Sequence, residues 1–111
     1  MEIDEHGTGR LAVLVLSGSL QEDARHCHGL VGERVDRLAA EGKTLVILDL
    51  ADLGQMDAMG VGEIAAAYRR ARARGADLKL LSPSPRVGRL LSVTKLQTII
   101  DVWEGSESPA V

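Results

Sequence analysis

Apolar and polar residues alternate at the start of the chain in the way that predicts a β-hairpin. Residues 11–16 read LAVLVL, an apolar run rich in β-branched residues that is typical of a strand. Residues 1–6 come before it, and there Met1 and Ile3 alternate with polar side chains. Because Gly7-Thr8-Gly9 supplies turn residues between the two stretches, we expect them to pair as a hairpin.

The spacing changes to the helical period in two later segments, which flank a buried strand. The first predicted helix extends from Gln21 to the stop at Gly42, and its apolar residues at helical spacing are Ala24, Cys27, Val31, Val35 and Leu38. Residues 45–48 (LVIL) form a continuous apolar run, as in a strand that is covered on both faces. The second helix is predicted from about Met59 to Arg74, with an apolar side made of Val61, Ile64, Tyr68 and Ala71.

Three shorter elements follow. A strand is predicted at residues 77–81 (DLKLL), a short helix at residues 86–93 after the turn SPSP, and a last strand at residues 99–103. Residues 105–111 are polar and contain proline, so a flexible tail is expected there and residues 1–104 are predicted to form a single domain.

Strands that alternate with helices after an initial hairpin indicate the α/β class. The prediction is a mixed, mainly parallel sheet of four or five strands, with crossover helices and an N-terminal hairpin. In such sheets binding sites form at the carboxyl ends of the strands. The loop after Leu53, which leads into the second predicted helix, lies at such an end.

That junction reads MDAMGVGE, residues 56–63, and contains two glycines although a helix is beginning. Each glycine costs about 1 kcal/mol relative to alanine in a helix interior. Asp57 is well placed to be the N-cap, because its carboxylate can accept a hydrogen bond from the amide of Met59 or Gly60. The bare backbone at Gly60 and Gly62, with the adaptable side chain of Met59, suits either a partner's close approach or tight packing within the domain.

Composition removes several classes of function. The chain has 111 residues and a formal net charge of -3, so clustered positive charge for nucleic acid is not expected. Its longest apolar run is far below the roughly 20 residues that cross a bilayer, so no direct membrane insertion is expected. The start MEIDEHG lacks the regions of a signal peptide, and Cys27 is a single cysteine; a cytoplasmic location is therefore expected.

The sequence predicts neither a catalytic site nor a metal site. Consecutive helical residues point about 100 degrees apart, so His26-Cys27-His28 cannot converge on one ion, and no metal site is predicted. The arginines of the second helix, at positions 69, 70, 72 and 74, are expected to form a solvated face. No nucleophile lies beside a base in a motif, so neither an enzyme nor a cofactor is predicted.

From Leu14 to about Trp103 the sequence resembles the STAS domain family, which is named for sulfate transporters and anti-sigma-factor antagonists. The blocks that carry the resemblance are LVLSGSL, TLVILDLADLGQMDAMG and AAAYRRARARGADLKLLSPSPRVGRLLSVTKL, in the family's order and spacing. Antagonists of this family have an apolar strand, an Asp-Leu pair and then Asp-Ser-Ser-Gly at the head of the second helix. Asp49-Leu50 and Asp57-Ala58-Met59-Gly60 occupy those places.

The chain departs from the family pattern at the regulatory position. The resemblance implies that the first serine of the motif is the one phosphorylated by a partner kinase, and Ala58 stands there. Met59 replaces the second serine, and no serine or threonine occurs from Gly54 to Gly62. Gln21 replaces an aspartate that many members have after the Gly-x-Leu of residues 18–20.

The resemblance implies a module that binds another protein, without phosphorylation at the usual site. The partner would be an anti-sigma factor of the serine-kinase type. The predicted docking residues are Gln21, Gln55, Met56, Asp57, Ala58, Met59, Gly60 and Val61. The alternative is a small STAS subunit of a membrane lipid-transport complex, whose partner would be the transporter ATPase.

Overall fold

The computed structural model of the chain describes residues 2–20 and 29–103. The residues predicted to form the first half of helix one, 21–28, and the end of the chain, 104–111, lie outside the described residues, and so does the expected tail. None of the helices in the described part is both long enough and apolar enough to span a membrane.

The predicted hairpin is present, but its turn lies two residues later than expected. Strand β1 (Glu2–Thr8) pairs antiparallel with β2 (Leu11–Leu20), and the last pair is Thr8↔Leu11. Gly9 has a φ of 56°, which suits the first central position of a two-residue hairpin turn. Gly7 pairs with Ala12 as an ordinary strand residue, so the turn predicted over Gly7–Gly9 was wrong in position.

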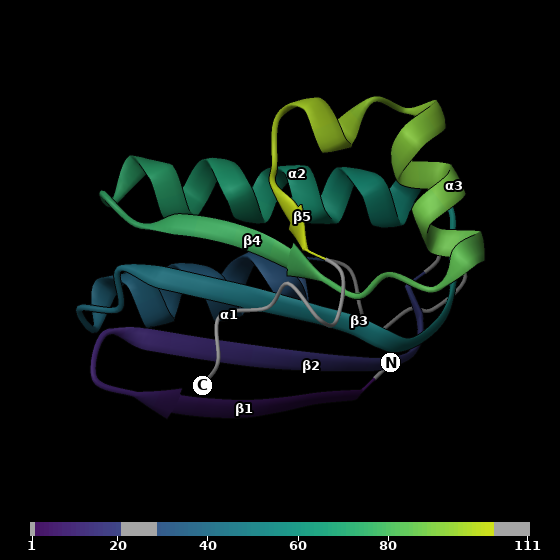
Figure 1. Ribbon diagram of the computed structural model, residues 1–111. Coiled ribbons are helices and arrows are strands. Elements are labelled where there is room, and N and C mark those ends of the chain that lie inside the picture. The colour runs from purple at the N-terminus through teal and green to yellow at the C-terminus, as the bar shows by residue number, and fades with distance from the viewer. Residues whose placement is uncertain (1, 21–28, 104–111) are drawn as a thin grey trace.

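In the described part of the chain, five strands form one sheet in the order β1-β2-β3-β4-β5, and Figure 1 shows their arrangement. Strands β3 (Leu45–Met56), β4 (Asp77–Leu81) and β5 (Val102–Trp103) each run parallel to the strand before them, and only β1 is antiparallel. The predicted α/β class, with a mainly parallel sheet and an N-terminal hairpin, is confirmed.

The crossovers contain helices α1 (Leu30–Ala40), α2 (Ala58–Ala73) and α3 (Pro85–Val93), and a short 3-10 turn, η1 (Leu96–Thr98), precedes β5. Right-handed crossovers between successive neighbours place their helices on the same face of a sheet. In Figure 1, α1 and α2 run along one side of the strands, and α3 lies near the ends of β3 and β4.

The core lies between this face of the sheet and the helices. Alternate strand residues point into it, and Leu14, Leu48 and Leu80 at the centres of three strands are fully buried there. They pack in one cluster with helix residues that include Val35, Ile64 and Leu91. The helical spacing in the sequence therefore identified the buried sides of α1 and α2 correctly.

Two predicted boundaries differ because sheet pairing, not periodicity, sets them. The strand predicted at 45–48 continues to Met56, since β2 supplies partners as far as Leu20↔Met56. Strand β5 is only Val102–Trp103, so the strand predicted over 99–103 was too long: Ile99 follows the η1 turn and is 61% exposed.

Candidate docking site at the start of helix α2

The carboxyl ends of the parallel strands meet at the end of the sheet where α2 begins. Strand β3 ends at Met56, Asp57 follows it, and α2 starts at Ala58. In Figure 1 this end of α2 lies beside α3. The side chain of Ser84, the N-cap of α3, donates a hydrogen bond to the carbonyl oxygen of Leu53 at 3.3 Å. This bond fixes the start of α3 against the end of β3.

Asp57 is the N-cap of α2, as the sequence predicted. Its backbone is extended, with φ -116° and ψ -171°, and its carboxylate accepts a hydrogen bond from the amide of Gly60 at 3.1 Å. The amide of Val61 donates to the carbonyl oxygen of Asp57, also at 3.1 Å, and closes the first turn of the helix. The cap satisfies a helix amide and places a negative charge at the positive end of the helix dipole.

The predicted docking residues divide by exposure. Gln55 and Ala58 are exposed, whereas Asp57, Met59 and Val61 are half-buried. Met56 and Gly60 are buried, and the side chain of Met56 belongs to the core cluster. The surface available to a partner is therefore made by Gln55, Ala58 and the exposed parts of their half-buried neighbours. Gln21 lies outside the described residues, although Leu20, the residue before it, pairs with Met56.

The two glycines of the junction have different surroundings. Gly60 is buried, so a side chain at that position would compete with its neighbours for space. Gly62 is exposed, and a Cβ added there would meet no atom within 4 Å. Its φ is not positive, so its backbone conformation does not require glycine either. Nothing in the described part of the chain accounts for a glycine at position 62.

Glu63 was not among the predicted docking residues. Within residues 2–20 and 29–103 it is the one charged side chain that is buried, with 8% of its surface exposed. Its carboxylate oxygen Oε1 accepts a hydrogen bond from the backbone amide of Gly29 at 2.6 Å. Gly29 is the N-cap of α1, so Glu63 caps a second helix from within α2. A signal was available: Glu63 lies three residues after Gly60 and four before Ala67, on the buried side of α2.

Ion pairs at the other end of α2 hold it against α1. The guanidinium of Arg74 contacts the carboxylate of Asp36 at 2.7 Å. Hydrogen bonding to Arg74 lowers the pKa of Asp36 below its usual value, and the same bond raises the pKa of Arg74. The arginines of α2 are exposed, as predicted, although Arg72 and Arg74 are paired with aspartates and are not free charges.

The described residues around this junction offer no grouping for metal chemistry. Across residues 2–20 and 29–103, no three His, Cys, Asp or Glu side chains come close enough to hold an ion. The sequence His26-Cys27-His28 lies outside the described part. What the junction does present is a capped helix start with small side chains, which suits contact with another macromolecule.

Sequence comparison identifies the family to which this architecture belongs. The profile described as STAS domain matches residues 6–108, most of the chain. The chain is a member of the STAS domain family. It is 36% identical over 75 residues to the anti-sigma-B factor antagonist of Bacillus subtilis (strain 168), an alignment that covers 68% of each protein.

Solved STAS structures have the same fold. The anti-sigma factor antagonist SpoIIAA in its unphosphorylated form superposes with a TM-score of 0.74 and 23% identity, over 91% of this chain and 87% of that one. The phosphorylated form of the Bacillus SpoIIAA superposes with a TM-score of 0.67 and 22% identity, over 91% and 90%. At these identities the likeness concerns the fold alone. The STAS fold expected from the sequence is confirmed.

Proposed function

We propose that this STAS domain is an anti-sigma-factor antagonist that works by binding an anti-sigma factor of the serine-kinase type through the start of α2. The observation that supports it most directly is the exposure of Ala58 and Gly62 at the start of α2, in a chain similar to an anti-sigma-B factor antagonist. The docking surface consists of Gln55, Asp57, Ala58, Met59 and Val61, and Gln21 is included as the residue that follows Leu20.

Among the residues of this surface, only Asp57 carries a charged side chain. Ala58 is exposed at the first position of the helix, beside the capping carboxylate of Asp57. A phosphate at this position would add nearly two negative charges next to Asp57 and would have to be desolvated in any complex. Alanine cannot be phosphorylated, so this domain stays competent to bind its partner, and regulation acts elsewhere.

The mode of action is binding and release of a protein, without covalent chemistry or a cofactor. Gln55 and Ala58 can contact the partner directly. Because Gly62 has no side chain, the backbone of the partner can approach the next turn of α2. Glu63 and Asp57 act as positioning residues, because each fixes a helix start through a backbone amide. The working location is the cytoplasm, where sigma factors act.

The first test is a charge placed on the docking surface. Ala58→Glu should weaken binding to an anti-sigma factor of the serine-kinase type at least tenfold by isothermal titration calorimetry, because it adds an unpaired charge to the contact. Ala58→Gln has nearly the same size without the charge and should weaken binding less. Ala73→Glu, at the exposed far end of α2, should leave affinity unchanged.

Two outcomes would contradict the proposal. Equal affinity of wild type and Ala58→Glu would place the interface elsewhere on the domain. Release of the complex when ATP is added would show a phosphorylation switch despite Ala58. If a transporter ATPase co-purifies with the chain and the anti-sigma factor does not bind, the domain is a transport-complex subunit instead.

A further inference from the structure

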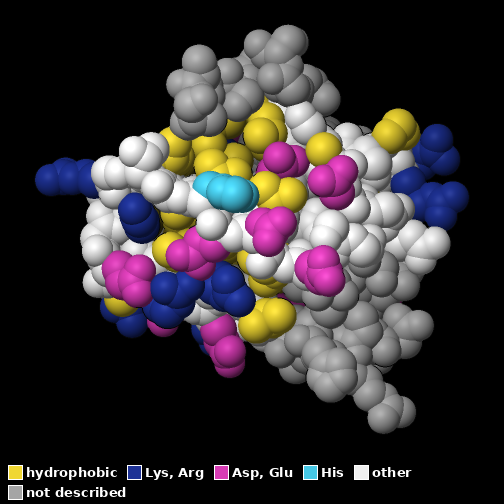
Figure 2. Space-filling model, turned by 90° about the horizontal axis from the view of Figure 1, so that it is seen from below, with side chains coloured by type: hydrophobic (Ala, Val, Ile, Leu, Met, Phe, Trp, Pro, Cys, Tyr) yellow, Lys and Arg dark blue, Asp and Glu magenta, His cyan; other side chains and the backbone are white. Residues whose placement is uncertain are grey.

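Among the described residues, no strand pairs with the outer edge of β1, and the order of side chains along β1 is complementary to a second copy of itself. β1 is the first strand of the sheet, and of its residues only Ile3 is half-buried, the rest being exposed. Figure 2 views the molecule from below relative to Figure 1, which is the side where β1 lies. On this face the described histidine is surrounded by acidic and apolar side chains. We infer that two copies of this chain pair through β1, antiparallel about a two-fold axis at Glu5, and form one continuous ten-stranded sheet.

The backbone of β1 determines which groups are free to pair. Thr8 and Leu11 flank a two-residue turn, so they exchange both of their backbone hydrogen bonds. Antiparallel pairs alternate, so every second residue of β1 bonds to β2 in this way, and these residues are Glu2, Asp4, His6 and Thr8. The amides and carbonyls of Ile3, Glu5 and Gly7 therefore point to the free edge.

Only one alignment uses all of these groups. With the axis at Glu5, Ile3 lies opposite Gly7 of the second copy, and Glu5 lies opposite Glu5 of the second copy. All three residues then bond through both of their backbone groups. A two-fold axis at Asp4 puts Gly7 opposite position 1, which lies outside the described residues, and an axis at His6 puts Ile3 opposite Gly9 in the hairpin turn, so neither alignment pairs all three residues within β1. Intermediate alignments would put side chains from opposite faces side by side.

Charge favours the same alignment. Exposed carboxylates on an edge strand normally prevent pairing between chains, and β1 has three, on Glu2, Asp4 and Glu5. With the axis at Glu5, Asp4 of each copy faces His6 of the other, and Glu2 faces Thr8. With the axis at Asp4, the two Asp4 carboxylates would face each other, and with the axis at His6 the two imidazoles would.

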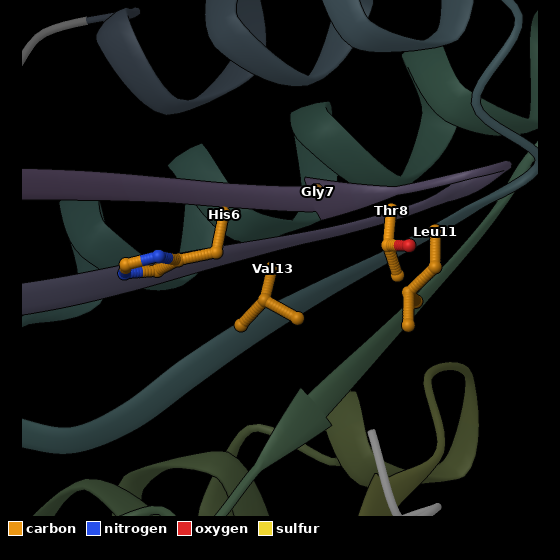
Figure 3. Close-up of a pocket in the computed structure, with 5 residues that line it drawn as sticks. All are labelled: His6, Gly7, Thr8, Leu11 and Val13. Carbon is orange, nitrogen blue, oxygen red and sulfur yellow. The ribbon is translucent and has the colours of Figure 1, made fainter.

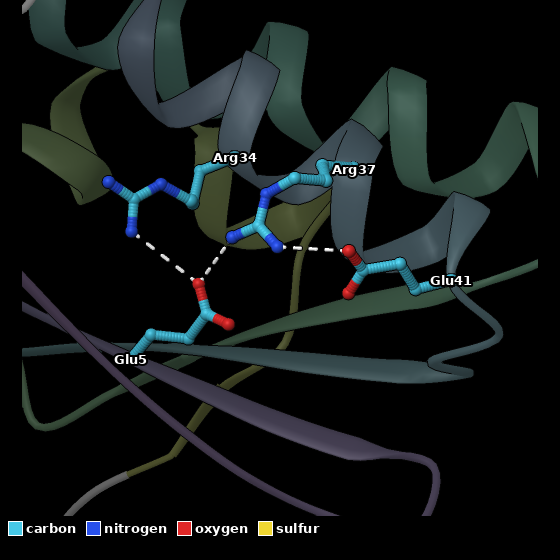
Figure 4. Close-up of polar contacts among 4 residues, drawn as sticks. All are labelled: Glu5, Arg34, Arg37 and Glu41. Atoms are coloured by element: carbon cyan, nitrogen blue, oxygen red, sulfur yellow. Dashed lines mark hydrogen bonds and ion pairs between the residues drawn. The ribbon is translucent and has the colours of Figure 1, made fainter.

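The like-charged pair at the axis is already neutralised within each copy. The carboxylate of Glu5 contacts Arg37 at 2.5 Å and Arg34 at 3.4 Å, and Arg37 also contacts Glu41 at 3.0 Å, as Figure 4 shows. The hydrogen bond to Glu5, and to a smaller extent the one to Glu41, raises the pKa of Arg37 above its usual value, so the guanidinium stays charged. Two Glu5 carboxylates can therefore lie side by side, because four arginines surround them.

Asp4 and His6 are free to make the contact. Within the described part of the chain, the side chain of neither residue takes part in a hydrogen bond or an ion pair, although both pair with β2 through their backbones. His6 lines an open hollow of about 240 Å³, and Figure 3 shows Val13 of β2 next to it and Leu11 farther along, beside Thr8. On this face β2 presents Leu11 and Val13 and no charge next to His6, and Asp4 is its charged neighbour along β1. The imidazole can therefore turn towards the second copy.

The pairing leaves the docking surface of each copy open. The axis is perpendicular to the sheet and reverses the strand direction, so the two α2 starts face opposite ends of the dimer. Each can bind a partner, and the dimer does not depend on the function proposed above. Because the contact involves a single strand from each copy, the dimer should be weak and should dissociate on dilution.

The test is a charge exchange, read by sedimentation velocity over a series of protein concentrations. His6→Asp places two carboxylates opposite each other on both sides of the axis and should weaken the dimer at least tenfold. The double variant Asp4→His with His6→Asp restores the complementary pairs in exchanged positions and should recover most of that loss.

Cross-linking tests the alignment itself. In a chain carrying Cys27→Ser, Glu5→Cys should form a disulfide between two copies, since a hydrogen-bonded pair has its Cα atoms about 5.5 Å apart. Asp4→Cys in the same background should cross-link far less, because position 4 faces position 6. A chain that is monomeric at every concentration, or a dimer that His6→Asp does not weaken, overturns the inference. Equal cross-linking at positions 4 and 5 overturns it as well.

Discussion

Gly60 and Gly62 lie two residues apart in the same helix, yet only Gly60 is enclosed by the domain. Glycine at the exposed position 62 lowers the stability of the helix, and no contact within the described part of the domain explains it. Under the proposed binding function, the missing side chain leaves room for a partner's backbone or side chain. The functional role of this residue can therefore be separated from its structural role by experiment.

Gly62→Ala should stabilise the isolated domain and weaken its complex with the anti-sigma factor. We expect the free energy of unfolding, measured in urea, to rise by about 0.5–1 kcal/mol, because alanine is the better helix former and meets no atom here. Affinity should fall several-fold. Gly32→Ala in α1, where an added Cβ would be 3.7 Å from the Arg70 side chain, is the matched control without an effect on affinity. If Gly62→Ala binds as tightly as wild type, a close approach at this turn is refuted.

At the scale of elements, α1 and α2 are joined at both of their ends. Glu63 accepts a hydrogen bond from the amide of Gly29 at one end, and Arg74 pairs with Asp36 at the other. The carboxylate of the first contact is buried and the ion pair of the second is exposed. Salt therefore screens the second contact more strongly than the first. Their combined effect is to orient the start of α2 relative to α1, and the proposed docking surface depends on that orientation.

The Asp36–Arg74 pair should make helix packing sensitive to acid. The pKa of Asp36 is lower in the folded chain than in the unfolded one, so its contribution to stability is present above the unfolded value of about 4. That contribution is lost as the pH falls through the folded pKa. In urea titrations, the stability difference between wild type and Asp36→Asn should be constant near neutral pH and should shrink below about pH 4. A difference that does not shrink below about pH 4 would mean that the pair contributes nothing.

At the scale of the whole molecule, one cluster of side chains connects the sheet to all three helices. Leu48 lies on the central strand β3 and is fully buried in that cluster. The hairpin strand β1 contributes only the partly buried Ile3 to it. The core therefore stabilises the strands and helices that hold the docking surface, whereas β1 keeps a free edge.

Leu48→Ala should destabilise the whole domain by about 2–5 kcal/mol, because it leaves a cavity that rigid neighbours cannot fill. A single cooperative urea transition with an unchanged slope and a lower midpoint is the expected result. Val93→Ala, at a position that is 73% exposed, should shift the midpoint little. Two separate transitions in Leu48→Ala would show that the hairpin unfolds independently of the rest.

Local sequence patterns predicted the class of fold and the elements that carry the site. The helical spacing placed the buried sides of α1 and α2, and Asp57 was identified as the cap from its position alone. These features depend on residues within a few positions of one another, so the sequence contains what is needed to predict them. The family resemblance then predicted the STAS fold within the α/β class.

The sequence by itself determined the order of strands and helices, the cap at Asp57 and the absence of a hydroxyl from Gly54 to Gly62. Tertiary structure decided how far β3 extends, which of the two glycines is enclosed, and that Glu63 caps α1 across the interface. It also left β1 at the edge of the sheet with its backbone unpaired on one side. These features depend on contacts between residues far apart in the chain, such as Leu20 with Met56 and Gly29 with Glu63, and no periodicity within a single segment records them.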